Sequence, residues 1–111
     1  MATDTEKILT NLRKGVLEFC VLAAISGEPK YGRDLAHALS EQGMLAGEGT
    51  LYPLLSRLRD TGFVSTELTE SSQGRQRRYY SLAPAGRARL EEFRSAWAPF
   101  RTTVDTLLEK H

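Results

Sequence analysis

The stretch from Gly47 to Leu58, GEGTLYPLLSRL, decides which fold the sequence predicts. Glycines interrupt regular structure, and an amphipathic helix from Thr50 to Asp60 follows them at once. Its inner face consists of leucines at helical spacing, namely Leu51, Leu54, Leu55 and Leu58. Its outer face carries Thr50, Tyr52, Pro53, Ser56 and Arg57. A purely structural helix usually exposes Glu and Lys, whereas hydroxyls and a guanidinium suit phosphates and base edges. We therefore expect this helix both to fill a core and to contact a partner.

Two further helices are predicted before this one. Apolar residues recurring at i, i+3 and i+4 predict a first helix from about Asn11 to Ile25, largely buried. A second helix is expected from about Tyr31 to Gln42, with Gly43 as its C-terminal cap. Three short helices in succession, with a tight turn before the third, are typical of a helix-turn-helix core.

Two short strands are predicted after the third helix. The run Phe63–Leu68 alternates and is rich in β-branched residues, and Arg77–Leu82 would be the returning strand after a turn at residues 71–74. Tyr80 and Leu82 share one face of that strand and are expected in the core. A hairpin in this position is a wing, which contains no acidic residue in its second half. The predicted fold class is mainly α (α+β), a winged helix-turn-helix with a two-stranded wing.

The last helix is predicted to begin at Pro84 and to carry a heptad seam. The seam residues are spaced by three and four positions: Leu90, Phe93, Trp97, Phe100, Val104 and Leu107. One such seam needs a partner surface, so we expect a C-terminal dimerisation helix. Pro99 should kink this helix, but the seam keeps its phase, which favours one bent helix over two. The chain is thus expected to divide into a DNA-binding domain at 1–83 and a dimerisation helix at 84–111.

The charge distribution points to a confined anionic partner. The net charge is only +1, yet residues 46–90 carry seven Arg and four acids, and residues 71–90 carry five Arg and none. A glycine before the third helix, Gly49, allows close approach of a phosphate to the helix N-terminus. The wing adds Gly74, Arg75, Arg77 and Arg78. Such arginines suit a narrow minor groove or the phosphate backbone, although a charged hairpin that only protects a sheet edge is the alternative.

Other functional classes find little support in the sequence. The single cysteine, Cys20, lies in an apolar run and is expected to be a small core residue. No acid, histidine or cysteine pattern has metal-ligand spacing, and no nucleophile–base pair or phosphate loop is present. We therefore expect no enzyme, metal or cofactor. The N-terminus lacks an apolar signal core and no run could span a membrane, so a cytoplasmic protein without a membrane partner is expected.

These motifs resemble the PadR family of bacterial transcriptional regulators over nearly the whole chain. The resemblance rests on LRKGVLE at 12–18, YG at 31–32, GTLYPLLSRL at 49–58 with Gly62, GR at 74–75, RYYSL at 78–82 and AG at 85–86. The chain departs from the family in having Arg33 after Tyr31-Gly32 instead of an aromatic residue, and Ala83 instead of Thr before the last helix. Its short last helix is similar to the subgroup that contains multidrug-sensing repressors.

The resemblance implies a homodimeric repressor that binds a palindromic DNA operator. The expected DNA-binding residues are Tyr31, Gly49, Thr50, Tyr52, Pro53, Ser56, Arg57, Gly74, Arg75, Arg77 and Arg78. In the multidrug-sensing subgroup, a tryptophan that matches Trp97 stacks on planar drugs. This implies a small aromatic effector at the dimer interface, with Trp97, Phe93 and Leu12 as candidate ligand-binding residues. Packing of Trp97 within the dimer seam is the plainer interpretation. The alternative function is a winged-helix dimer that serves as a protein-interaction or ligand-sensing module without binding DNA.

Overall fold

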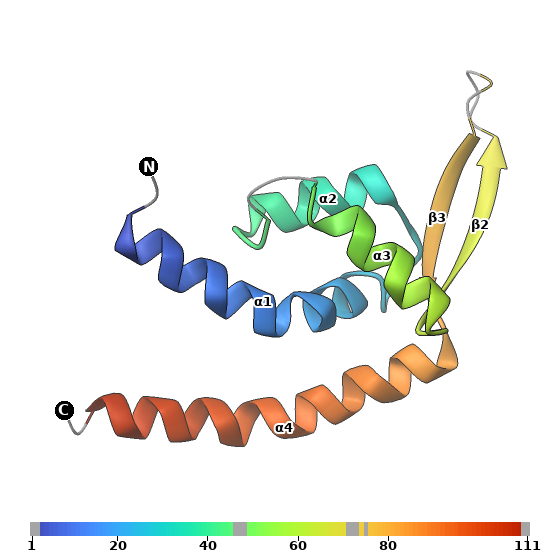
Figure 1. Cartoon of the computed structure of the whole chain (residues 1–111). Coiled ribbons are helices and arrows are strands. Elements are labelled where there is room, and N and C mark those ends of the chain that lie inside the picture. The colour runs from blue at the N-terminus through green and yellow to red at the C-terminus, as the bar shows by residue number, and fades with distance from the viewer. Residues whose placement is uncertain (1–2, 46–48, 71–73, 75, 110–111) are drawn as a thin grey trace.

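Four helices and one small antiparallel sheet make up the described part of the chain, residues 3–45, 49–70, 74 and 76–109 of a computed structural model. The elements follow the order α1 (Asp4–Ala24), β1 (Lys30–Tyr31), α2 (Gly32–Glu41), α3 (Leu51–Asp60), β2 (Val64–Glu70), β3 (Gln76–Leu82) and α4 (Pro84–Glu109). Helices α1 to α3 cluster beside the hairpin, which projects from them, and α4 runs back along α1 from the base of the hairpin (Figure 1). The predicted winged helix-turn-helix is confirmed.

Helix α1 begins seven residues earlier than the predicted start at Asn11. The reason is a capping box: the Thr3 hydroxyl accepts a hydrogen bond from the Glu6 amide, and the Glu6 carboxylate accepts one from the Thr3 amide, both at 3.1 Å. The predicted start was therefore wrong. The first turn of the predicted helix also differs from its predicted burial, because Leu12 is exposed.

The core forms where three helices meet the base of the sheet. The four leucines of α3 are all buried, as predicted from their spacing. They pack with buried side chains of α1, α2, β2, β3 and α4, among them Val21, Leu22, Leu35, Val64, Tyr80 and Leu90. Cys20 is partly buried against this cluster, in agreement with its predicted packing role, and burial raises the pKa of its thiol.

Helices α2 and α3 end in the same way. Gly43 (φ +75°) follows α2 and Gly62 (φ +85°) follows α3, each in the left-handed region that favours glycine. The Met44 amide donates to the Leu39 carbonyl and the Phe63 amide donates to the Leu58 carbonyl, both at 2.9 Å. These are Schellman caps, which confirm the predicted role of Gly43 and fix the direction in which the chain leaves each helix.

The sheet contains three strands in the order β1-β3-β2, one more than the predicted hairpin. The missed strand β1 pairs Lys30 with Tyr80 and Tyr31 with Tyr79. A two-residue strand leaves no alternation to detect in the sequence. The hairpin itself pairs antiparallel from Val64–Leu82 at its base to Glu70–Gln76 near its tip. Tyr80 is buried and Leu82 packs against the core, as predicted.

Helix α4 is one continuous helix that starts at Pro84 and contains Pro99, which confirms a single helix over two. Leu90 is only 3% exposed and belongs to the core of this chain. Its assignment to the dimerisation seam therefore needs correction, because its surface is already covered by the winged-helix core. The remaining seam positions lie further along the helix and keep exposed surface.

Gly86 is one point at which α4 touches the winged-helix core. A Cβ atom built there would overlap the backbone carbonyl oxygen of Phe63 and would lie 2.8 Å from Cδ1 of Leu82. A backbone oxygen cannot move out of the way by changing a rotamer, so only glycine allows this approach of α4 to the base of β2.

Gly86→Ala is expected to lower the free energy of unfolding by about 3 kcal/mol, because the methyl group has no space. Gly15→Ala is the matched control, since Gly15 also lies in a helix and has nothing within 4 Å of its built Cβ. That control should raise stability by about 0.5–1 kcal/mol through helix propensity. Urea unfolding followed by circular dichroism measures both changes. Equal stability of the two variants would contradict the close approach.

Candidate nucleic-acid interface

The outer face of α3 is exposed as the sequence predicts. Gly49 and the whole predicted set Thr50, Tyr52, Pro53, Ser56 and Arg57 are exposed. Thr50 occupies the N-cap position, but its hydroxyl makes no capping hydrogen bond. Pro53 lies in the first turn, where a backbone N–H would lack an intrahelical partner. The N-terminal end of α3 thus presents a hydroxyl and backbone amides toward solvent, which is favourable for an anion.

Tyr52 both packs and faces solvent. Its side of α3 lies against the start of α2, where a Cβ on Gly32 would be 3.1 Å from a carbon of the Tyr52 ring. The residue nevertheless keeps 39% of its surface exposed. Gly32 therefore makes room for the tyrosine ring, and the packing holds it at the edge of the surface that α3 exposes.

Aromatic stacking joins β1 to the middle of the wing. The Tyr31 and Tyr79 rings stack with centroids 3.8 Å apart, and the Arg77 guanidinium lies 5.2 Å from the Tyr31 ring centroid. The hydrogen bond with Thr69, and then that with Tyr79, lowers the pKa of Tyr31, whereas the hydrogen bond with Tyr31 raises the pKa of Tyr79. The stack holds Arg77 at the surface near the predicted contact residue Tyr31.

The wing arginines are placed differently from one another. Arg78 is half-buried and donates a 2.8 Å hydrogen bond to the Thr66 hydroxyl across the hairpin. Arg77 is exposed. Gly74 is exposed in the turn with φ +79°, and the predicted contact Arg75 lies outside the described residues. Arg77 is therefore the described wing cation that is most accessible to a phosphate.

A hollow brings part of α3 and the wing together. It has a volume of about 230 Å³ and lies between the start of α2, the start of α3 and strand β3. Its lining includes four of the predicted DNA-binding residues, Tyr31, Tyr52, Arg77 and Arg78. Arg33, one of the departures from the family pattern, also lines it. The helix and the wing thus contribute to one surface.

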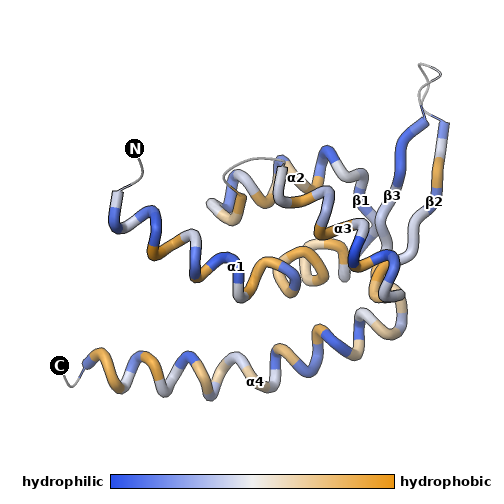
Figure 2. Tube along the Cα trace, in the orientation of Figure 1, coloured by the Kyte–Doolittle hydropathy of each residue, from blue (hydrophilic) through white to orange (hydrophobic). Residues whose placement is uncertain are grey.

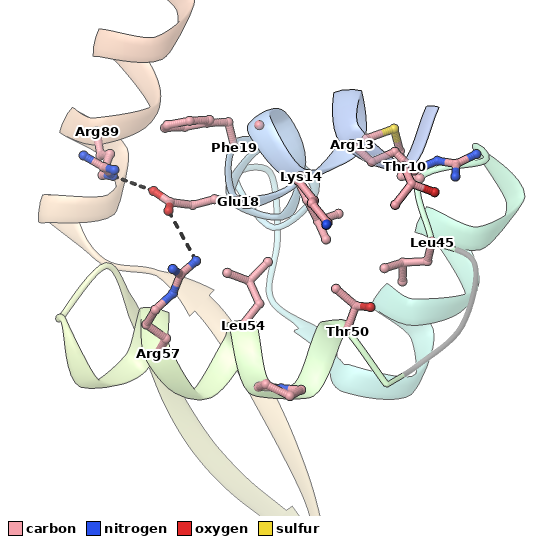
Figure 3. A pocket seen from close by; sticks show the side chains of 14 residues that line it. Thr10, Arg13, Lys14, Glu18, Phe19, Leu45, Thr50, Leu54, Arg57 and Arg89 are labelled. Carbon is pink, nitrogen blue, oxygen red and sulfur yellow. Dashed lines mark hydrogen bonds and ion pairs between the residues drawn. The ribbon is translucent and has the colours of Figure 1, made fainter. Parts of the chain in front are cut away.

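The other flank of α3 faces α1 across a groove of about 570 Å³ (Figure 3). Thr50, Pro53 and Arg57 line it from α3, opposite Arg13 and Lys14 of α1. The predicted contact residues therefore divide between two sides of the same helix. Sequence spacing could not show this division, because it depends on where α1 and α2 pack.

Glu18 is a residue of this groove that the sequence analysis did not single out. Its carboxylate lies between Arg57 of α3 and Arg89 of α4, as Figure 3 shows. The available signal was an acid inside the otherwise apolar run from Val16 to Ala24. An acid held there needs a charged or hydrogen-bonding partner, since burial of an unpaired carboxylate is costly.

An aromatic ladder connects α1 with α4. Phe19 and Phe93 stack at 4.1 Å with an interplanar angle of 9°, and Trp97 continues the stack at 5.6 Å from Phe93. Phe100 follows at 6.4 Å from Trp97 in a tilted arrangement. Trp97 is 38% exposed. Leu12, the third candidate ligand-binding residue, is exposed on the neighbouring helix α1.

Apolar residues remain uncovered on the outer halves of both long helices, where Figure 2 shows orange segments on α1 and α4. They are Ile8, Leu9 and Leu12 of α1, and Trp97, Phe100, Val104, Leu107 and Leu108 of α4. Within the described residues, no helix is long and apolar enough to cross a membrane. The same residues contain no group of His, Cys, Asp and Glu side chains suited to a metal ion.

Three helices with an arginine-bearing hairpin define the chain as a winged helix-turn-helix protein. It belongs to the PadR family: the profile of the "Transcriptional regulator PadR-like family" matches residues 21–92. Members of this family are transcriptional regulators and not enzymes, which confirms both the predicted family and the predicted functional class.

Individual relatives agree with this placement. A PadR-like transcriptional regulator from Bacillus cereus is 40% identical with a TM-score of 0.80, over 88% of this chain and 96% of that chain. A PadR family regulator from Eggerthella lenta is 31% identical with a TM-score of 0.86, over 96% and 94%. The transcriptional regulator Rv3488 of Mycobacterium tuberculosis is 34% identical over 79% of this chain and 81% of its own.

A more distant structure was solved with DNA. PadR of Bacillus subtilis, in complex with operator DNA, is 23% identical with a TM-score of 0.65. The match covers 70% of this chain and 47% of that one. At this identity the two proteins share the fold.

Proposed function

We propose that this regulator represses transcription by binding a palindromic operator as a homodimer. The observation that carries the proposal is the two-sided helix α3: its buried leucines hold hydroxyls and a guanidinium outward, and its Tyr52 shares a hollow with the arginines of the wing. The B. subtilis protein of the same fold, solved with operator DNA, supports this use of the surface. Helix α3 of each subunit would enter a major groove, and Arg77 of the wing would contact the neighbouring backbone or minor groove.

A second copy of the chain is the partner that fits the uncovered apolar face. From Phe93 onward, α4 repeats apolar residues at heptad spacing, and all of them beyond Phe93 are exposed in one chain. Pairing of these faces removes apolar surface from water, which is the main driving force of stable association. We propose residues 1–83 as the DNA-binding unit and residues 84–111 as the dimerising helix, whose first turns at Gly86 and Leu90 also complete the core.

A small planar aromatic compound is the effector class that the ladder suits. Trp97 is stacked on one neighbour and retains an exposed surface on which a flat ring can lie. Two copies of Trp97 in a dimer would offer two such surfaces. A compound bound there changes DNA affinity only by as much as it favours one dimer arrangement over the other.

Arg77→Ala is expected to weaken binding to a duplex taken from the DNA upstream of the chain's own gene, because the variant loses one phosphate contact. The slope of log K against log salt should fall by about 0.9 per subunit. Fluorescence anisotropy over a range of salt concentrations measures this slope. Arg78→Ala should change the slope less, since the Arg78 guanidinium is already bonded to Thr66.

Arg101→Ala is the matched control for the loss of one positive charge, because Arg101 is exposed on α4 far from the wing. Its salt slope should equal that of the wild type. An unchanged slope for Arg77→Ala would remove the wing from the DNA surface. Failure of the wild type to bind any duplex would favour the alternative, a protein-interaction or ligand-sensing dimer.

Val104→Glu is expected to convert the homodimer to a monomer, because a carboxylate within the apolar face of α4 would have to lose its hydration on pairing. Light scattering after size-exclusion chromatography measures the mass. Thr102→Glu introduces the same charge at an exposed position of α4 outside the heptad seam and should leave a dimer. A dimeric Val104→Glu variant would show that other surfaces join the subunits.

Trp97 is the only tryptophan of the chain, so its emission reports on the proposed effector surface alone. Titration with a panel of planar aromatic compounds should quench this emission, because a stacked ring lies in direct contact with the indole. If no compound changes the emission, Trp97 is a packing residue of the seam.

A further inference from the structure

The carboxylate of Glu18 joins three helices. Glu18 lies in the C-terminal half of α1, and its Oε2 accepts a 2.5 Å hydrogen bond from Nε of Arg89 in α4. Its Oε1 lies 3.6 Å from Nη2 of Arg57 in α3. The Glu18 side chain is 19% exposed, compared with 62% for Arg57. One partly buried carboxylate is therefore paired with two guanidinium groups. Together Glu18, Arg57 and Arg89 carry a net charge of +1.

The two arginines are held with unequal strength. The Arg89 guanidinium also lies over two rings, 5.4 Å from the Phe19 centroid and 5.0 Å from the Phe63 centroid. Arg57 has Glu18 as its one ionic partner among the described residues, at a separation beyond hydrogen-bond reach. Because the Arg57 side chain is exposed to solvent, this ion pair is weak, and Arg57 can exchange Glu18 for another anion. Arg57 is thus the partner that can leave Glu18.

Among the described residues that line the groove, no other acid competes for Arg57. The further charged residues that line it, Arg13 and Lys14, are both cations. Arg13 already donates a 2.8 Å hydrogen bond to the Gly43 carbonyl. The position of the Arg57 guanidinium therefore depends on Glu18 alone among the acids that line the groove.

We propose that Glu18 is a positioning residue that restrains Arg57 and so limits the affinity of α3 for DNA. This inference rests on the proposed DNA-binding function. In the free protein, Glu18 draws Arg57 toward α1. In the complex with DNA, the Arg57 guanidinium binds a backbone phosphate, and the Glu18 carboxylate remains paired with Arg89. DNA binding thus includes the cost of separating Arg57 from Glu18.

The same contacts tie this restraint to α4. Arg89 lies one turn before Phe93 on α4, and its guanidinium covers Phe19, which stacks on Phe93. When Arg89 lies closer to Glu18, its positive charge offsets more of the carboxylate charge, and the attraction between Glu18 and Arg57 weakens. When Arg89 moves away, that attraction becomes stronger. The position of α4 thereby sets how firmly Glu18 holds the arginine of α3.

The test is a double-mutant cycle between Glu18→Gln and Arg57→Gln. The probe is a mixed-sequence duplex of about 40 base pairs, since phosphate contacts do not depend on sequence. Glu18→Gln should tighten binding by about two- to fivefold, the range expected when an exposed ion pair no longer has to be broken. In the Arg57→Gln background, Glu18→Gln should have almost no effect on affinity. This result distinguishes loss of the Glu18–Arg57 interaction from a general effect of removing one negative charge.

Arg89→Gln is expected to change DNA affinity in the opposite direction from Glu18→Gln. Without Arg89, the whole carboxylate charge acts on Arg57, so binding should weaken more than in Arg87→Gln. Arg87 is an exposed arginine of α4, two residues away, and controls for the lost positive charge. The excess weakening should disappear when Arg57→Gln is added. Circular dichroism on each variant establishes that it is folded.

Weaker or unchanged binding by Glu18→Gln, or an equal effect with and without Arg57, would overturn the inference while leaving DNA binding intact. Absence of binding by the wild type would instead refute the proposed function, and the inference with it. If Glu18→Gln does not fold, the inference is tested by comparing Arg89→Gln with Arg87→Gln, because both variants retain Glu18. Equal affinities of these two variants for DNA would then overturn it.

Discussion

Burial of the α3 leucines is the constraint on which the rest of the structure depends. Leu51, Leu55 and Leu58 are almost completely shielded from solvent, so rotation of α3 about its axis would expose them at a cost of about 1.5–3 kcal/mol each. The same helical period fixes which residues face outward. Burial of the leucine face in the core therefore determines which residues of α3 lie on its exposed face.

Glycine positions in other parts of the fold also determine how α3 is oriented. The left-handed glycines at 43 and 62 fix how the chain leaves α2 and α3, and Gly32 gives space to the Tyr52 ring. Helix α4 approaches the base of the wing through Gly86 and closes the core with Leu90. The proposed DNA-binding surface therefore depends on a few glycine positions, where any larger side chain has no room or no favourable backbone conformation.

Much of the fold follows from local sequence signals, and the discrepancies have identifiable causes. Leucine spacing, the alternation of the wing and Pro84 each act over a few residues, so the corresponding elements were predicted. Strand β1 is stabilised by pairing with β3 and has no pattern of its own. The inward position of Leu90 depends on where α4 crosses the core, which the heptad pattern alone does not specify. The capping box of Thr3 and Glu6 is also a local signal, and it accounts for the turns of α1 that precede the predicted start.

The candidate site was predictable in composition but not in arrangement. Exposure of the α3 residues follows from periodicity, whereas their division between the hollow beside the wing and the groove beside α1 depends on tertiary packing. Pairing of Glu18 with Arg57 and Arg89 joins positions far apart in sequence, and only the folded chain brings them together.

The contacts of Gly86, Leu90 and Phe93 also make α4 a lever. From Phe93 to its end at Glu109, the helix extends by about 24 Å. A rotation of about 5° at Phe93 displaces that end by about 2 Å. In the proposed homodimer, a molecule that changes the angle between the two α4 helices would therefore change the spacing of the two winged helices, without altering the core of either one.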